Sequence, residues 1–488
     1  MNALSLGTLR PRLAVVLPKR QTPADAAPAG ERGVGWQIWS LVGVLFFLYM
    51  LLSLRTHERM LSNSFDLAIF EQVVHSYAHG RLPVSEVKGP DFPVLGDHFS
   101  PILATLAPFY WLWPSVKTLL VAQAALVAVS VVPLALWVRR TLGLTAALVV
   151  GAAYGLSWGI ASAVGFDFHE VAFAVPFLAF SLAALGQERL RAAAWWAMPL
   201  LLVKEDLGLA VCVIGLLIAR RGARRLGLIT AGIGLGASLL TVLVILPAFS
   251  PSGDYGHWSG LDSVAAGDGD WASLLYRGTI GVITPMTKPS ALLLSLAPTL
   301  FLAVRSPLIL VAVPTFGWRF VSHYSANWGV DYHYSLVVMT IVFAAFIDAL
   351  VRRRPGTATL RRYLAGTAAI TLLLLPQFSF WKLVQPATWH SDPRIGTARE
   401  VMRLIPDGDT VQASTFLVPQ LAGRTSVSLF GWPDSRPNPQ WILVDTALPD
   451  NRRWPLSYLQ ERAALDAARA RGYSTAASTG GFVLLRRS

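Results

Sequence analysis

Cysteine, charge and familiar catalytic motifs are all scarce in this chain of 488 residues, and each scarcity excludes a class of protein. Cysteine occurs once, at Cys212 inside an apolar stretch, so the chain has no disulfide framework. Charged residues make up 14% of the sequence, whereas a soluble domain carries about 25%. The sequence contains no Walker phosphate loop, no GxSxG motif, no Cys/His zinc spacing and no internal repeat.

Hydrophobic residues dominate instead. They account for 54% of the sequence, and the mean hydropathy of +0.50 is typical of a protein with many membrane segments. The formal net charge of +13 suggests nucleic-acid binding at first sight, but the basic residues cluster in short loops between apolar runs. The positive-inside rule explains such loops, so we expect the lipid bilayer as a partner and no nucleic acid.

The apolar runs predict an all-α polytopic bundle over residues 36–381, with about eleven membrane segments. Residues 1–35 are rich in Pro, Ala and Arg and are expected to form a disordered cytoplasmic tail. Trp36–Leu54 is expected to be a membrane anchor without a cleavage site, followed by a long first outer loop over residues 55–115. The bias of arginine toward alternate loops predicts a multi-pass protein of the plasma (inner) membrane with a cytoplasmic N-terminus.

The character of the chain changes after about Lys382, where charges rise and apolar spans stop. Residues 382–488 therefore predict a small soluble α/β domain on the extracytoplasmic side. VQAS at 411–414 and WILVDTA at 441–447 are interpreted as strands, and Leu459–Arg471 as a helix. The last residues predict a hairpin that turns at Gly480-Gly481.

Lys204, Glu205 and Asp206 interrupt an apolar run that extends from Ala192 to Ala219. Each ionisable group at the centre of a membrane helix costs about 2.5–3.5 kcal/mol on insertion. We therefore expect two short helices that meet at a charged tip, with the tip lining a water-filled cavity. The alternative is one long tilted helix whose charges are paired inside the bundle. We favour the arrangement with two short helices, because its turn places the charged tip on the same side of the membrane as the other acidic loops.

Ten ionisable side chains then fall at the outer ends of membrane segments: Asp66, Asp97, His98, Asp167, His169, Glu170, Lys204, Glu205, Asp206 and His333. Carboxylates and imidazoles suit general-base catalysis on a hydroxyl, and lysine suits binding of a phosphate. Structural alternatives exist. Asp66 can serve as a first-turn charge of a helix and Asp97-His98 as a loop cap. The acidic cluster at 167–170 can be an ordinary interfacial loop, Lys204 can pair with a carboxylate, and His333 can belong to an aromatic belt.

No metal site is assigned and no cofactor is firmly implied. A divalent cation could be held by four of the carboxylates, but their spacing is not diagnostic: Asp97, Asp167, Glu170 and Glu205. Glu71, His75 and His79 recur at four-residue intervals on one helix face. They are interpreted as the water-exposed side of that helix rather than as metal ligands.

Four segments resemble a family of uncharacterised bacterial membrane proteins, a domain of unknown function: FDLAIFEQ, GDHFSP, DFHE and KEDLGL, at residues 65–72, 96–101, 167–170 and 204–209. The resemblance spans roughly residues 40–430, and VQASTFLVPQLAGR looks like the start of the family's C-terminal portion. That family in turn resembles the GT-C class of membrane glycosyltransferases, which take a sugar from a polyprenyl-phosphate carrier. In this resemblance Asp66 stands where a catalytic acidic residue is expected, although Leu67 follows it and the paired-acid signature of the class is absent.

The resemblance implies a glycosyltransferase that moves a sugar from a polyprenyl-phosphate-linked donor to an envelope glycan, lipid or protein acceptor. Asp66 is expected to deprotonate the acceptor hydroxyl, and Lys204, with His98 or His169, to hold the donor phosphate. Two other functions remain open. A lipid or solute transporter predicts charged sites reachable from both faces. A non-catalytic envelope assembly factor predicts that charge substitutions in the cavity change function little.

Overall fold

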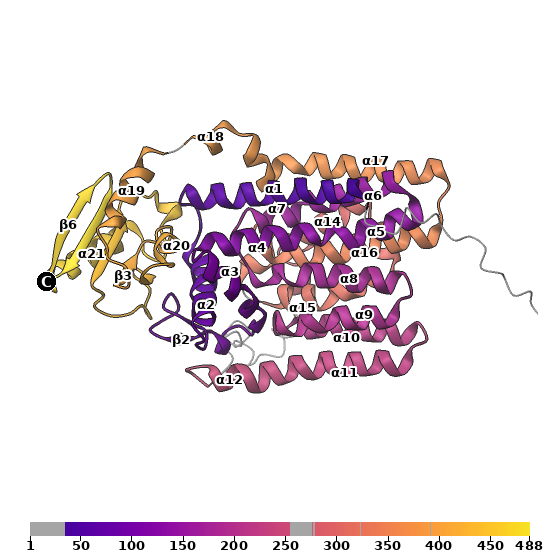
Figure 1. The fold of residues 1–488 in the computed structure, drawn as a ribbon, viewed down its shortest axis with the longest axis horizontal. Helices are drawn as coiled ribbons and strands as arrows, with labels where there is room; N and C mark the ends of the chain where they lie inside the picture. The colour runs from indigo at the N-terminus through magenta and orange to yellow at the C-terminus, as the bar shows by residue number, and fades with distance from the viewer. Residues whose placement is uncertain (1–34, 254–275, 277–278, 323, 391) are drawn as a thin grey trace, which may run out of the picture.

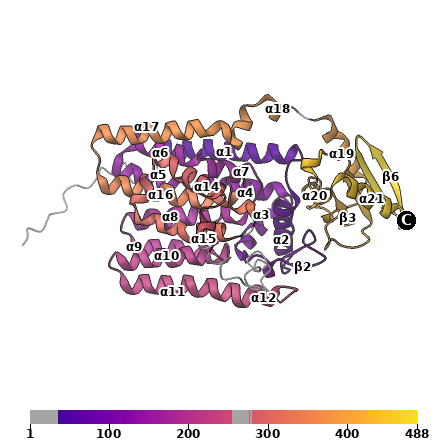
Figure 2. The ribbon, with the colours of Figure 1, turned by 180° about the vertical axis from the view of Figure 1, so that it is seen from behind.

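The computed structural model describes residues 35–253, 276, 279–322, 324–390 and 392–488 (Figure 1). The predicted cytoplasmic tail, apart from Gly35, lies outside these residues. Most helices run side by side along one direction, and the C-terminal sheet lies beyond one end of them (Figures 1 and 2). The first loop, with α2 (Ile69–Ala78) and α3 (Ala107–Leu112), occupies the space at that same end.

Among the described residues, five helical stretches are long and apolar enough to cross a membrane: Trp36–Glu58, Val116–Leu142, Arg224–Phe249, His333–Arg353 and Thr357–Gln377. The bent pair α6 (Leu144–Gly155) and α7 (Trp158–Val164), with 48° between its helices, makes a sixth if it is one span. The expectation of a helical membrane protein is confirmed, but the number of about eleven spans is not. The reason is length, because a span needs about 20 residues, and the other apolar helices have only 10–17.

Helix α16 is the centre of the bundle, and every residue from Leu336 to Leu350 is buried. By contrast, α11 and α17 expose apolar side chains such as Leu239 and Leu373, which suits contact with lipid. The bounds of the bundle helices are α1 (Trp36–Glu58), α4 (Val116–Val129), α5 (Val131–Leu142), α8 (Ala174–Gly186), α9 (Leu190–Ala197), α10 (Leu207–Arg220), α11 (Arg224–Leu240), α12 (Leu246–Phe249), α14 (Thr287–Leu296), α15 (Val313–Val321), α16 (Leu336–Arg353) and α17 (Thr357–Leu374).

The C-terminal part contains a five-stranded sheet in the order β4-β3-β5-β7-β6. Strand β3 pairs in parallel with β4 and β5, whereas β7 pairs antiparallel with β5 and β6. The predicted strands, helix and hairpin are all present. The bounds of the strands and helices in this part are β3 (Thr410–Ala413), β4 (Ser426–Leu429), β5 (Trp441–Asp445), β6 (Tyr473–Thr479), β7 (Phe482–Arg487), α18 (Pro386–Trp389), α19 (Pro393–Arg403), α20 (Val418–Leu421) and α21 (Tyr458–Ala470). The domain division at residue 382 and the side of the membrane on which the sheet lies stay predictions.

The first loop joins the bundle to the C-terminal sheet through polar contacts. Its short hairpin, β1 (Val84–Ser85) and β2 (Phe92–Pro93), carries Glu86, whose two carboxylate oxygens each accept a bond of 2.7 Å from Arg436. The Gln72 side chain donates to the carbonyl oxygen of Val427 at 2.9 Å. These contacts fix the loop to the C-terminal part, and the backbone N–H of Phe99 in the same loop donates to Glu205 on the bundle side at 3.3 Å.

Candidate functional site

The charged triplet lies in a turn, as the sequence predicts. Residues 203–206 separate a short helical stretch, Leu190–Leu202, from α10. The Ser238 hydroxyl of α11 donates to the carbonyl oxygen of Glu205 at 2.7 Å. Because α10 and α11 pack along glycines such as Gly215 and Gly227, where a Cβ would meet backbone atoms of the facing helix, the two backbones lie close and the turn is held in place.

A continuous series of charged contacts links this turn to the first loop. Asp66 lies in the helical turn Ser64–Ala68, and its carboxylate is 3.5 Å from Nε2 of His169. The other imidazole nitrogen, Nδ1, contacts the carboxylate of Glu170. Glu170 is fully buried and forms an ion pair with Nζ of Lys204, with 3.0 Å between the carboxylate oxygen and the nitrogen. We call this series, Asp66–His169–Glu170–Lys204, the relay.

The relay becomes less buried from Glu170 toward Asp66. The Glu170 side chain has no exposed surface and that of His169 has 6%, whereas that of Asp66 has 24%. Asp66 is therefore the most accessible member of the relay. His169, Glu170 and Lys204 lie behind it, where they orient the carboxylate and supply compensating charge.

Gln123 positions the relay, and sequence reasoning did not single it out. Its side-chain oxygen accepts from the backbone N–H of His169 at 3.0 Å, and its side-chain nitrogen donates to the carbonyl oxygen of Asp167 at 3.0 Å. The signal in the sequence is a polar amide in the middle of the apolar run that forms α4. In the structure this amide is buried. Asp167 itself accepts from the backbone N–H of Asn63 at 2.8 Å, so it holds the segment that precedes Asp66.

A second series of contacts leads from the turn into the first loop. Glu205 lies 3.6 Å from Nδ1 of His98 and accepts from the backbone N–H of Phe99 at 3.3 Å. Nε2 of His98 is 3.6 Å from Asp97, which pairs with Lys88 at 2.9 Å. The structure thus brings Asp97, His98 and Glu205 together.

His333 and Asp206 complete the cluster. The His333 ring stacks on His169 with 3.3 Å between ring centres. Lys204, Asp206 and His333 border a cavity of about 20 Å³, which has room for about one water molecule. This cavity is too small for an organic ligand.

The electrostatics of the cluster keep its charges paired. Burial opposes the charge of Lys204, but Glu170, Glu205 and Asp206 raise its pKa. Burial also opposes ionisation of Glu205, yet His98 and Lys204 lower its pKa to about 2.

Three further groups show how strongly burial acts here. For His169, burial opposes the charged form, but the interactions with Glu170 and Asp66 together raise the pKa. Burial raises the pKa of Asp206 to about 6 and that of Asp167 well above its usual range. The two aspartates therefore take up protons more readily than ordinary aspartates do.

The carboxylates do not form a metal-binding set. Within the described part of the chain, no three His, Cys, Asp or Glu residues are placed to share a metal ion. The interpretation of Glu71 as water-exposed is wrong, whereas His75 and His79 are exposed as expected. Glu71 is fully buried and accepts from the hydroxyl of Tyr110, and burial raises its pKa to about 7. The reason is that α3 covers this face of α2, which helix periodicity alone does not reveal.

An aromatic cluster adjoins Asp66. The rings of Phe65, Trp432 and Trp454 lie 4.8–5.4 Å apart, centre to centre, and join the first loop to the C-terminal part. Trp454 is 44% exposed. The buried Nε1–H of Trp432 has no hydrogen-bond acceptor among the described residues. Indole rings offer an apolar face and a polar edge together, so this cluster can bind a ring that carries both kinds of surface.

Comparison of the chain with known proteins identifies its family, but the description of that family names no chemical reaction. The family model described as "Predicted membrane protein (DUF2079)" matches residues 56–484, which include all ten candidate site residues. No curated protein matches the chain.

Proposed function

The chain belongs to this family of predicted membrane proteins, and from the geometry of its site we propose that it is a membrane glycosyltransferase. The relay carries the proposal, because it backs a partly exposed carboxylate with an imidazole and a buried ion pair. This arrangement suits a general base, since the base must be reachable by the hydroxyl while its neighbours fix its orientation.

The proposed donor is a sugar on polyprenyl phosphate, and the proposed acceptor is a hydroxyl of an envelope glycan, lipid or protein. Asp66 takes the proton of the acceptor hydroxyl. The acceptor oxygen forms a bond to the anomeric carbon of the sugar while the bond from that carbon to the phosphate oxygen breaks. Polyprenyl phosphate leaves with the electron pair of the broken bond. His169 stabilises the Asp66 carboxylate before the proton arrives.

The aromatic cluster supports a sugar as the substrate class. Phe65 directly precedes Asp66, so the cluster lies next to the proposed base. The unpartnered Nε1–H of Trp432 offers a hydrogen bond to a sugar hydroxyl. A buried donor without an acceptor costs free energy, which a bound hydroxyl recovers. We therefore place a sugar ring against Trp432 and Trp454.

Lys204 receives a different role from the one that the sequence suggests. Its ammonium group contacts Glu170, and Glu205 and Asp206 are its immediate chain neighbours. A phosphate at Lys204 would meet these carboxylates as well as the ammonium group. We therefore assign Lys204 to the relay, where it neutralises Glu170, and place the donor phosphate elsewhere.

The proposal includes a GT-C-like topology of about eleven membrane segments, in which the chain turns back at Lys204-Glu205-Asp206. The N-terminus lies in the cytoplasm, and the relay and the C-terminal domain lie at the outer face of the plasma membrane. The members of the relay gather at one end of the bundle, which supports an enzyme at one membrane face over a transporter with a path through it.

The test uses the purified full chain in lipid nanodiscs, with a radiolabelled polyprenyl-phosphate sugar as donor. Asp66→Asn should abolish sugar transfer, by at least about a thousandfold, and leave donor binding unchanged, because only the proton acceptor is lost. Asp91→Asn is the matched control, since Asp91 lies in the same loop with its side chain 84% exposed. Transfer by the Asp66→Asn protein at the wild-type rate would remove Asp66 from the mechanism.

A further inference from the structure

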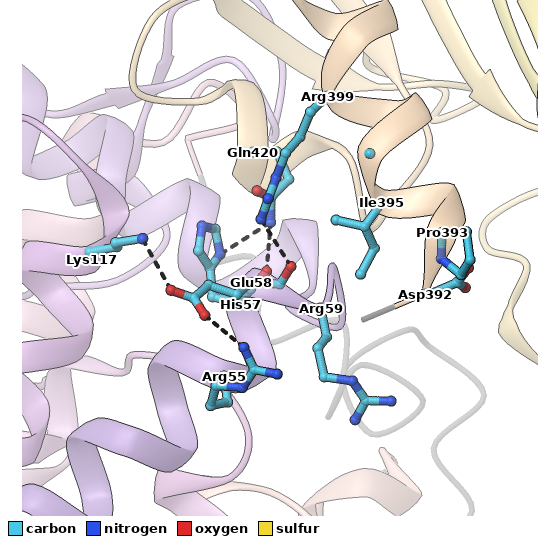
Figure 3. A pocket seen from close by; sticks show the side chains of 11 residues that line it. Arg55, His57, Glu58, Arg59, Lys117, Asp392, Pro393, Ile395, Arg399 and Gln420 are labelled. Carbon is cyan, nitrogen blue, oxygen red and sulfur yellow. Dashed lines mark hydrogen bonds and ion pairs between the residues drawn. The ribbon is translucent and has the colours of Figure 1, made fainter. Parts of the chain in front are cut away.

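A second cavity, of about 780 Å³, lies between the end of α1, the start of α4 and α19 (Figure 3). None of the ten candidate site residues lines it. Its size lies in the range of cavities that bind small ligands or lipid headgroups. The first loop, the bundle and the C-terminal part all contribute to its walls, so it depends on the assembled fold.

The lining of this cavity is strongly basic. Four cationic side chains, from Arg55, Arg59, Lys117 and Arg399, face two carboxylates, those of Glu58 and Asp392. Both carboxylates are already engaged. Glu58 pairs with Arg55 at 3.1 Å and with Lys117 at 3.5 Å. Asp392 accepts from the backbone N–H of Arg394 at 2.9 Å and caps α19.

Two guanidinium groups are left without a carboxylate. Arg399 donates to the carbonyl oxygen of Glu58 at 3.4 Å, and within the described residues neither Arg399 nor Arg59 forms an ion pair. Two planar guanidinium groups in one cavity are suited to a phosphate, whose oxygens accept paired hydrogen bonds from arginine.

The position of the cavity is at the edge of the membrane. Helix α1 is a candidate span that ends at Glu58, and a second candidate span ends at Gln377, just before the segment that carries Trp381, Val384 and Trp389. These three side chains are 40%, 64% and 47% exposed. The Arg55 guanidinium lies 5.6 Å from the centre of the Trp389 ring and donates to the carbonyl oxygen of Thr388 at 2.9 Å. Exposed tryptophans beside basic residues are typical of the level of lipid headgroups.

We propose that this cavity binds the phosphate group of an anionic membrane lipid, with Arg59 and Arg399 as its main ligands. The acyl or prenyl chain then stays in the bilayer, beside the exposed Trp381 and Trp389. Bound in this way, the lipid links α1 and α19 and ties the C-terminal part to the membrane surface. The binding site does not require that the protein transfers a sugar.

The test measures equilibrium binding of a fluorescent short-chain phosphatidylglycerol to the purified full chain in neutral detergent. Phosphatidylcholine with the same chains and inorganic pyrophosphate serve as competitors. Wild-type protein should bind phosphatidylglycerol at least tenfold more tightly than phosphatidylcholine. The double variant Arg59→Gln/Arg399→Gln should bind it at least tenfold more weakly, because both guanidinium groups that lack carboxylate partners are lost. Arg471→Gln is the matched control, since Arg471 is exposed and lies outside the cavity lining.

Each outcome decides the proposal. Equal binding of phosphatidylglycerol by wild type and by the double variant would overturn it, as would equal binding of the two lipids. If pyrophosphate binds in an arginine-dependent manner and phosphatidylglycerol does not, the ligand is a soluble phosphate compound and the lipid assignment is wrong. The thermal unfolding midpoint without ligand shows whether the double variant is folded. If it is not, Arg59→Gln and Arg399→Gln are tested singly, each with an expected loss of at least threefold.

Discussion

Breaking the ion pair between Glu170 and Lys204 should destabilise the protein strongly, and a double-mutant cycle can measure the coupling. Removing one partner of a buried ion pair costs about 3–5 kcal/mol, because the other charge is left uncompensated. Glu170→Gln removes the carboxylate that faces both Lys204 and His169, so we expect a loss near the upper end, about 4–5 kcal/mol. Lys204→Met leaves Glu170 with His169 as a partner and should cost about 3 kcal/mol.

The double variant Glu170→Gln/Lys204→Met should lose less than the sum of the two single losses, by at least about 2 kcal/mol, because it contains neither uncompensated charge. The assay is equilibrium unfolding of the full chain in neutral micelles titrated with a denaturing detergent, followed by tryptophan fluorescence and circular dichroism. The exposed pair Asp466–Arg469, at 2.7 Å with side chains 69% and 44% exposed, is the control and should couple by less than about 0.5 kcal/mol. Single losses below about 1 kcal/mol, or additive losses, would refute the buried relay.

Two further predictions concern the first loop. Glu71→Gln should stabilise the protein at pH 8 by roughly 3 kcal/mol and have little effect at pH 4.5. The reason is that burial raises the pKa of Glu71 to about 7. The free energy of unfolding of the wild-type protein therefore falls as the pH rises from about 4.5 to about 7, and the variant does not share this loss. Unfolding measured across this range checks the sign, and a gap that narrows with rising pH would contradict it. Arg436→Lys should speed amide hydrogen exchange of residues 84–93 about fivefold, because lysine cannot make both bonds to Glu86 and the contact loses about 1 kcal/mol. Exchange at the wild-type rate would show that this contact does not hold the hairpin.

The turn at Lys204-Glu205-Asp206 was predictable because a strong local cost decides it. Three adjacent ionisable groups in an apolar run leave few arrangements, and the turn between Leu202 and Leu207 is one of them. The C-terminal hairpin was predictable for a similar reason, since two adjacent glycines between two extended runs specify a tight turn. In both cases the signal lies within a few residues of the structure that it predicts.

Partners that are distant in the sequence were not predictable in the same way. Glu71 looks solvated from helix periodicity, and only the packing of Tyr110 against it shows that it is buried. Gln123 lies 46 residues from the His169 backbone that it binds. The number of about eleven spans is not confirmed for another reason. Several apolar helices among the described residues are only 10–17 residues long, and apolar composition does not reveal where a helix ends. Hydropathy identifies a membrane protein, but length and bending are set by packing between helices.

The distribution of charge bears on the mechanism, because the relay and the basic cavity attract opposite groups. Around Lys204 stand the carboxylates of Glu170, Glu205 and Asp206, and their combined charge repels a phosphate. The cavity at the end of α1 has an excess of guanidinium groups and attracts one. The segment from Arg55 to Asp66 connects the two places within twelve residues. Under the proposed function, the arginines attract the phosphate of a lipid-linked sugar donor, and Asp66 acts on the acceptor hydroxyl. Loss of the arginines then weakens donor capture, whereas loss of the Asp66 carboxylate removes the chemical step, so the two halves of the proposed function can be separated by kinetics.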